Sequence, residues 1–292
     1  MDDPFTLPDA LRSRPPEPDE AHASTARDTG VFAFDLDRQC TPDYAAFSGV
    51  RVYRDFFDPH ESEQLLREIE ESRFVPAQSG KLKQHFGARV NFNKQRVNLS
   101  GFEGLPDYVR RIEERLRERL SHPSDDSHPV GDPHPADGAL VRTLDGFETT
   151  DVFVLRYDAR DASNFDLHRD DSFAYGETIL DLSLESDSVL TFVRVPERDE
   201  SCDPPGRLRE SAHEGFRDEE WAGAACVRVP LPARSLAVLY GPARFDWEHG
   251  ILAYDVDGQR TSITLRTLSD TLRETEVGRQ LVDIARRGAV AD

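Results

Sequence analysis

Short stretches in which apolar and polar residues alternate dominate the chain from residue 150 onward. Alternation with a period of two places successive side chains on opposite faces of a strand, so these stretches predict a series of short β-strands. Their spacing and the turn residues between them are typical of an all-β sandwich or barrel. The strands are expected at Asp151–Tyr157, Phe165–His168, Thr178–Leu184, Val189–Val195, Ala225–Val229, Ser235–Tyr240, Trp247–Ile251 and Thr261–Thr267.

Helical spacing replaces this alternation in the first half of the chain and again near the C-terminus. Arg51–Phe57 is expected as a strand, and Asp58 then offers an N-cap before a proline at the first helical position. Apolar residues recur at helical spacing after this point, which indicates amphipathic helices on the outside of the strands. The predicted helices cover residues 59–72, 106–120 and 274–287.

Polar segments divide the rest of the chain. Residues 1–46 are acidic and aperiodic and are expected to form a disordered tail, which leaves a single domain over residues 47–292. Two acidic, proline-containing inserts are expected within it, at residues 121–146 and 197–223. The first insert contains His122, His128 and His134, each followed by a proline. We interpret them as part of a solvated linker rather than a metal-binding tract, because no rigid element aligns them.

Composition narrows the function classes. Hydrophobic residues make up 37% and charged residues 32% of the chain, and the formal net charge is −20. No apolar run approaches the ~20 residues that span a bilayer. The acidic start shows no signal peptide, and the three cysteines form no CxxC pair, so a cytoplasmic protein without a membrane partner is expected, acting as a monomer. Such an acidic chain is not expected to attract nucleic acid over its whole surface.

The triplet His168-Arg169-Asp170, together with the distant His249, is the strongest candidate for chemistry. On an extended segment, residues i and i+2 point the same way, so an imidazole and a carboxylate can reach one metal ion. A second imidazole completes a set of two histidines and one carboxylate, which leaves positions open on a non-haem Fe(II) ion. With nine histidines in the chain such a triplet also arises by chance, so further residues must support it.

The segment Arg260–Arg266 begins eleven residues after His249 and supplies that support. In a strand, Arg260, Ser262, Thr264 and Arg266 share one face. Two arginines on an inward face are costly without an anionic partner, and a small dicarboxylate would neutralise both. The alternative is an outward face with solvated arginines.

Together with these residues, several further segments of the chain resemble the AlkB family of Fe(II)- and 2-oxoglutarate-dependent dioxygenases. The similarity extends from about Lys81 to Ser269. The matching segments are Lys83–Gly87, Val90–Gln95, His168–Asp171, Tyr175–Leu184, Val229–Leu239, Arg244–Ile251 and Arg260–Arg266.

The resemblance implies a mainly β (α+β) fold, a double-stranded β-helix or jelly-roll barrel with N-terminal helices packed outside and a substrate lid. It implies Fe(II), 2-oxoglutarate and O₂ as cofactor and co-substrates. The expected reaction is oxidative demethylation of nucleic acid or protein, in which an N-methyl group is hydroxylated and leaves as formaldehyde. Hydroxylation of a protein or small molecule without an N-methyl group, and ligand binding without turnover, remain as alternatives.

Individual roles follow from the resemblance. Arg260 is expected to pair with the distal carboxylate of 2-oxoglutarate and Arg266 to lie near the metal-side carboxylate. Tyr157 matches a tyrosine of the family that donates a hydrogen bond to the co-substrate. The family has an asparagine a few residues before this tyrosine, and this chain has Val154 or Leu155 there instead. The implied iron ligands are His168, Asp170 and His249. The implied 2-oxoglutarate contacts are Tyr157, Arg260, Ser262 and Arg266.

Residues 73–102 contain no Asp or Glu, and all three lysines of the chain fall within them. This region resembles the substrate lid of AlkB proteins, so we expect it to form a local basic surface for an anionic partner. Pairing with the chain's own acidic inserts is the alternative. Phe86 and Phe92 either stack on the substrate or are buried, Asp171 either contacts substrate, orients His168 or is simply exposed, and Trp247 is expected in the core. The candidate substrate contacts are Lys81, Lys83, Phe86, Phe92, Lys94 and Asp171.

Overall fold

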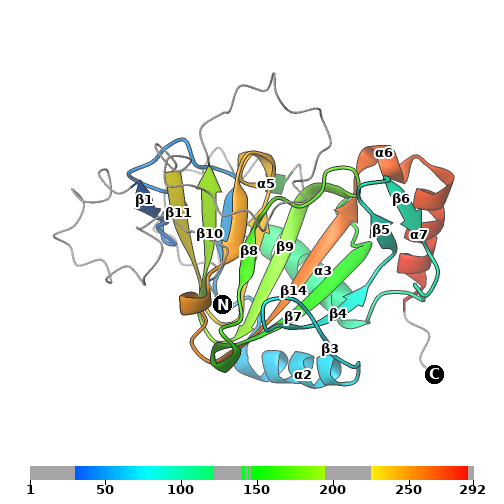
Figure 1. Cartoon of the computed structure of the whole chain (residues 1–292), viewed down its shortest axis with the longest axis horizontal. Coiled ribbons are helices and arrows are strands. Elements are labelled where there is room, and N and C mark those ends of the chain that lie inside the picture. The colour runs from blue at the N-terminus through cyan, green and yellow to red at the C-terminus, as the bar shows by residue number, and fades with distance from the viewer. Residues whose placement is uncertain (1–29, 122–139, 142–143, 145, 195–224, 289–292) are drawn as a thin grey trace, which may run out of the picture.

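Two β-sheets packed face to face form the centre of the protein, and Figure 1 shows the smaller sheet on the left and the larger on the right. The computed structural model describes residues 30–121, 140–141, 144, 146–194 and 225–288. In hydrogen-bonding order, the smaller sheet contains β1 (Val31–Ala33), β11 (Ala225–Leu231), β10 (Ser188–Arg194), β13 (Glu248–Ile251) and β8 (Phe165–His168). The larger sheet contains β2 (Val50–Tyr53), β12 (Ser235–Leu239), β9 (Tyr175–Glu185), β14 (Gln259–Leu268), β7 (Asp151–Asp158), β4 (Leu82–Phe86) and β3 (Val75–Pro76).

The larger sheet is a middle layer, because its strands bury both faces. On β7, Leu155 and Tyr157 face the smaller sheet, while Val152 and Val154 join a second core under the helices. The helices that complete this second core are α2 (Pro59–Glu70), α3 (Tyr108–Ser121) and α7 (Glu276–Arg287). The interior between the two sheets is therefore separated from the helices by the larger sheet.

Helix α2 starts where the sequence indicates. The side chain of Asp58 accepts a hydrogen bond from the amide of Glu61, and the side chain of Glu61 accepts one from the amide of Asp58. This capping box satisfies two amides that a helix start leaves unpaired. None of the described helices is long and apolar enough to cross a bilayer.

The remaining elements are short. Strands β5 (Arg89–Asn91) and β6 (Arg96–Asn98) form a separate hairpin, at the position where the sequence predicts the lid. The short helices are α5 (Gly241–Phe245), α6 (Asp270–Arg273), and the 3₁₀ turns η2 (Ala159–Asp161) and η5 (Ala253–Asp255).

The predicted strands agree with the observed ones to within a few residues, and the sheets have the layered arrangement expected of a jelly roll. Among the described residues the two sheets share no hydrogen-bonded strand pair, so the strands do not close into a continuous barrel.

Two predicted boundaries differ from the structure. The expected tail 1–46 extends too far, because residues 30–46 include β1, which pairs in parallel with β11, and the buried Phe32 and Phe34. In the first expected insert, 121–146, Leu140 and Leu144 are buried in the helix-side core. Burial of these apolar side chains stabilises both segments, although the sequence shows no periodic pattern in them. Residues 1–29, the three histidines 122, 128 and 134, and the insert 197–223 lie outside the described residues.

Candidate active site

His168 and His249 come together because their strands pair. In the antiparallel pair of β8 and β13, the two histidines are direct cross-strand partners. Gly250 permits this pairing, because a Cβ atom at that position would lie 2.4 Å from the carbonyl oxygen of Phe165. Asp170 follows His168 by two residues in the loop after β8. The spacing in the sequence and the strand register therefore bring the three predicted ligands to one place.

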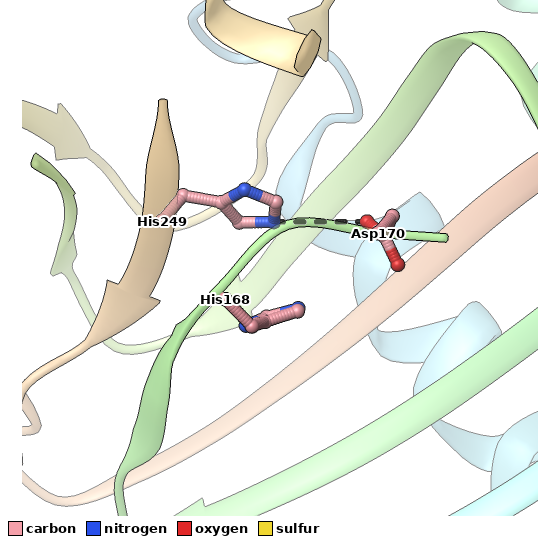
Figure 2. Close-up of side chains that lie close together, drawn as sticks. All are labelled: His168, Asp170 and His249. Atoms are coloured by element: carbon pink, nitrogen blue, oxygen red, sulfur yellow. Dashed lines mark ion pairs between the residues drawn. The ribbon is translucent and has the colours of Figure 1, made fainter. Parts of the chain in front are cut away.

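Figure 2 shows the three side chains pointing toward one another. Their potential ligand atoms all lie within 4.8 Å of one another, and His249 Nε2 is 3.7 Å from Asp170 Oδ2. The side chains of His249 and Asp170 are only 9% and 7% exposed. Two imidazoles and one carboxylate around one point match the ligand set of non-haem Fe(II) sites.

The ionisation of these groups suits metal binding. Burial lowers the pKa of His249 to about 3, with the neighbouring His168 acting in the same direction, so the imidazole is neutral at pH 7. Burial opposes ionisation of Asp170, but Arg266 and the two histidines hold its pKa well below its usual range. His168 Nδ1 lies 2.8 Å from the carbonyl oxygen of Asp166, which fixes the ring and leaves Nε2 for a metal.

Two buried polar atoms show that the residues fit an iron ion and its co-substrate. Among the described residues, neither Asp170 Oδ2 nor Arg266 Nε has a hydrogen-bond partner. A buried polar atom without a partner is costly, and a cation beside Oδ2 and an anion beside Nε would satisfy the two.

The polar face of β14 points into the space between the two sheets. Arg260, Ser262 and Arg266 are at most 6% exposed. The opposite face of the strand carries Ile263 and Leu265, which lie in the helix-side core. The arginines thus face inward, and the alternative of a solvated strand face is wrong.

Arg260 is already held by polar groups of the chain. Its Nε donates to Ser183 Oγ at 2.9 Å, and Nη2 lies 3.1 Å from Asp181 Oδ2. The guanidinium carbon also lies 5.1 Å from the centre of the Tyr157 ring. Burial raises the pKa of Tyr157, although Arg260 lowers it, so the phenol is a neutral hydrogen-bond donor.

Arg266 connects the predicted co-substrate residues to the metal ligands. Its Nη2 lies 2.9 Å from Asp170 Oδ1, and Nη1 lies 3.4 Å from Asp151 Oδ2. Burial alone would lower the pKa of Arg266, but Asp170 and other neighbours raise it above its ordinary value. Arg266 is therefore a permanent cation that orients the carboxylate of Asp170.

Several residues of the site escaped the sequence analysis. Asp181 interrupts an apolar strand on the same face as Ser183, which was a usable signal, but its partner Arg260 depends on the strand register. Asp151 was expected only as the start of a strand. Its Oδ1 lies 2.7 Å from His85 Nε2, and His85 stacks on Phe153 with ring centres 4.2 Å apart.

Arg244 was also missed as a site residue. It is 1% exposed, and its guanidinium donates to backbone carbonyl oxygens of the loop that carries Asp170 and of the start of β9. The acceptors are Asp170 at 2.7 Å, Gly176 and Asp171 at 3.2 Å, and Tyr175 at 3.4 Å. This side chain holds the backbone around a candidate ligand.

The predicted substrate contacts separate into three groups. Lys94 is exposed on the hairpin, Lys83 is half-buried, and Phe92 lies 6.2 Å from Tyr175 between ring centres. Phe86 packs against the helix-side core instead. Asp171 accepts a hydrogen bond from the amide of Ala174 and so holds its own loop, while the Asp166 carbonyl is the group that orients His168.

Lys81 differs most from its prediction. It is only 5% exposed, and its ammonium group donates to the carbonyl oxygen of Asn164. The alternation along β4 turns Lys81 toward the interior between the sheets rather than toward solvent. Trp247 is fully buried against Phe47, as expected of a core residue.

With this geometry established, comparison with known proteins defines the class. Residues 49–266 match the family described as the 2OG-Fe(II) oxygenase superfamily. The chain belongs to this family, and it is an oxidoreductase of the dioxygenase type that uses Fe(II), 2-oxoglutarate and O₂. The resemblance to AlkB proteins that the sequence indicated is confirmed by the relatives.

The chain is 32% identical over 251 residues to human alpha-ketoglutarate-dependent dioxygenase alkB homolog 4, covering 82% of this chain and 74% of that protein. It is 29% identical over 250 residues to the mouse protein of the same name, covering 82% of this chain and 75% of that protein. A Caenorhabditis elegans protein named DNA N6-methyl adenine demethylase is 24% identical over 226 residues, which cover 77% of this chain and 62% of that protein.

Proposed function

We propose that this dioxygenase removes N-methyl groups from a nucleic acid by oxidation. When bound, the iron and 2-oxoglutarate supply a hydroxylation that is coupled to the release of succinate and CO₂. An N-hydroxymethyl group then leaves as formaldehyde. The demethylase name of the nematode relative supports this proposal. Methylated protein is the other substrate class that the sequence suggested.

The observation that carries the proposal is a chain of contacts from an exposed basic hairpin to the candidate metal ligands. The ring centre of Phe92, between β5 and β6, lies 6.2 Å from the ring centre of Tyr175. The Tyr175 ring centre lies 4.9 Å from the guanidinium carbon of Arg266. Arg266 in turn contacts Asp170. A polymer bound on the hairpin would therefore place one of its units beside the site.

The hairpin is cationic on a strongly acidic chain. Arg89, Lys94 and Arg96 are exposed, and no carboxylate of the described residues lies within 4.0 Å of their charged groups. Fixed positive charge without a carboxylate partner among the described residues favours an anionic backbone, since phosphate contacts position a nucleic acid. This local charge favours nucleic acid over protein as the substrate.

The first experiment tests turnover. Purified protein is incubated with Fe(II), 2-oxoglutarate and O₂, and succinate is followed by NMR. We expect wild-type protein to form succinate and the His168→Ala variant to form none, because the metal loses a ligand. Succinate formation that is equal in both proteins would contradict the assignment of the metal site.

The second experiment tests the substrate. Methylated DNA, RNA and peptide panels are compared, with formaldehyde measured against succinate. One formaldehyde per succinate on an oligonucleotide supports demethylation, whereas succinate coupled to a stable hydroxylated product supports the alternative hydroxylase.

Charge reversal then tests the hairpin. We expect Arg89→Glu, Lys94→Glu and Arg96→Glu to weaken oligonucleotide binding and to reduce its salt dependence. Reversal of three exposed arginines on α2 and α7, Arg67, Arg279 and Arg287, is the matched control. Equal effects of both sets would show that only overall charge matters.

A further inference from the structure

Lys81 lies in the same cross-strand row as Tyr157 and Arg260. In the pair of β4 and β7, Leu82 is opposite Arg156, which places Lys81 beside Tyr157, and Tyr157 is the partner of Arg260 on β14. Adjacent strands are about 4.8 Å apart, so the row brings two cations to either side of one tyrosine. The ammonium nitrogen of Lys81 lies 5.9 Å and the Arg260 guanidinium carbon 5.1 Å from the centre of the Tyr157 ring.

The two cations have different partners. Arg260 is paired with Asp181, whose other oxygen accepts a hydrogen bond from Thr264 at 3.1 Å. Lys81 donates to the carbonyl oxygen of Asn164 and lies 5.0 Å from the centre of the Phe165 ring. No carboxylate among the described residues lies within 4.0 Å of its ammonium group.

Among the described residues, this buried ammonium group contacts a carbonyl and ring faces, while the charge of Asp166 acts on it from beyond 4.0 Å, so the group is poorly compensated. Partial charges replace little of the hydration that the group loses, so an anion in this space would bind favourably. Asp181 has already neutralised Arg260, and Lys81 therefore carries the uncompensated positive charge of the row.

We propose that Lys81 is a second anion-binding residue of the co-substrate pocket, which holds the distal carboxylate of 2-oxoglutarate together with Arg260. Asp181 then competes with that carboxylate for Arg260, and Lys81 makes up for the loss. The distal end of the pocket is thus formed by two cations and one resident carboxylate rather than by a single arginine.

The surroundings of Lys81 agree with this role. Burial lowers the pKa of Lys81 to about 8, and the charge of Asp166 on β8 offsets only part of that effect. Tyr157 on β7 is neutral. Lys81 is therefore mostly charged at pH 7, and a bound carboxylate would stabilise its charged form.

Co-substrate affinity is the direct test. Binding of 2-oxoglutarate is measured by calorimetry without O₂ and with Mn²⁺ in place of Fe²⁺, so that no turnover occurs. We expect Lys81→Met to weaken binding by roughly 10- to 100-fold, the usual value of a charge-assisted hydrogen bond. The control is Arg67→Met, which removes an exposed cation on α2 outside the site and should bind as the wild type does.

A second ligand shows which carboxylate Lys81 contacts. 2-Oxobutyrate has the same metal-binding end but no distal carboxylate. Its affinity should be nearly the same in Lys81→Met and wild type. Equal weakening of both ligands would mean that the substitution disturbs the pocket in general, and it would overturn the proposal, as would unchanged 2-oxoglutarate affinity.

Asp181 gives an independent arm. Asp181→Asn keeps the shape but removes the competing charge, so we expect 2-oxoglutarate to bind more tightly and Lys81→Met to cost less affinity in that background. Weaker binding by Asp181→Asn would contradict the competition.

Wild-type protein alone provides the last arm, which does not depend on the folding of any variant. The affinity ratio of 2-oxoglutarate to 2-oxobutyrate should fall as the pH rises above about 8, because the ammonium loses its charge while Arg260 keeps its own. A ratio that stays constant to pH 10 would overturn the proposal.

Discussion

Individual buried charges determine most of the site, and they differ in whether a carboxylate neutralises them. Arg266 faces Asp170 and Asp151, Arg260 faces Asp181, and Lys81 has no carboxylate within 4.0 Å among the described residues. A buried charge costs stability unless it is paired, so the unpaired one should be visible in the stability of the protein.

Lys81→Met should show this cost. The pKa of Lys81 is about 8 in the folded protein and about 10.5 when unfolded. Below pH 8 both states are protonated, and the folded state bears the full cost of the buried charge. Between pH 8 and 10.5 the folded state loses its proton first, so wild-type stability rises relative to the variant.

We therefore expect Lys81→Met, without ligand, to be at least as stable as wild type at pH 7, and this advantage to shrink toward pH 10. Urea denaturation at a series of pH values measures it. A variant that is less stable at pH 7 by an amount independent of pH would show that the charge itself is not the cause.

The residue scale also shows where sequence reasoning stops. Spacing indicated that His168 and Asp170 point the same way and that Arg260 and Arg266 share a face, and the family resemblance then singled out these residues together with His249. Asp151 gave no such signal, and Asp181 indicated only its own place in a strand, because spacing cannot identify the partner of a single carboxylate. The partners of these carboxylates lie 79 and 115 residues away and are decided by strand register.

At the scale of elements, short helix α5 supports the loop between β8 and β9. Arg244 on α5 donates to the carbonyl oxygens of Asp170 and Asp171, in a loop that no regular secondary structure covers. The pattern of α5 alone gives no hint of this, because a buried arginine appears in a sequence like any exposed one.

Arg244→Met should loosen this loop. We expect metal affinity to fall roughly 10- to 100-fold, as when partners behind metal ligands are removed. The exposed Arg169, which donates to Phe245 on the same helix, is the control as Arg169→Met. Mn²⁺ titration of both variants measures the effect, and equal affinities would mean that the loop holds itself.

Strand β1 is the element that the sequence analysis placed in a tail. Three residues carry too little alternation to predict a strand, and β1 exists because β11 offers it a parallel partner. The eight strands after residue 150 were predictable because each is a longer apolar or alternating stretch, and turn residues separate them.

Phe34→Ala tests the contribution of this segment. Phe34 is 5% exposed and meets Phe47 edge to face, and Phe47 contacts Trp247. We expect a loss of about 3–5 kcal/mol in the free energy of unfolding, as for other buried phenylalanines. Phe245→Ala, at a position 40% exposed, should cost far less. Similar losses for the two would show that the segment that follows β1 adds little to the core.

At the scale of the whole molecule, the chain has a net charge of −20, while its site contains the buried cations Lys81, Arg260 and Arg266. Surface carboxylates repel one another, and the repulsion falls as salt shortens the screening length from about 10 Å at 0.1 M. The negative net charge also repels anionic ligands, so these ligands should approach where positive charge is concentrated.

We expect the melting temperature to rise with salt, by roughly 2–4 °C for each kcal/mol of repulsion relieved. Thermal denaturation in NaCl and in choline chloride should give the same trend if screening is the cause. A falling melting temperature would show that surface ion pairs contribute more than the excess of like charge.

Strand β8 is the outermost strand of the smaller sheet, and it carries His168 next to the His249 of β13. An ion bound by both histidines would hold this edge strand to β13, because β8 could separate from the sheet only after the ion had been released. The availability of iron would then determine the local stability of this edge strand as well as catalysis. The amide exchange rates of residues 165–168 would serve as a gauge of how much of the protein carries its metal.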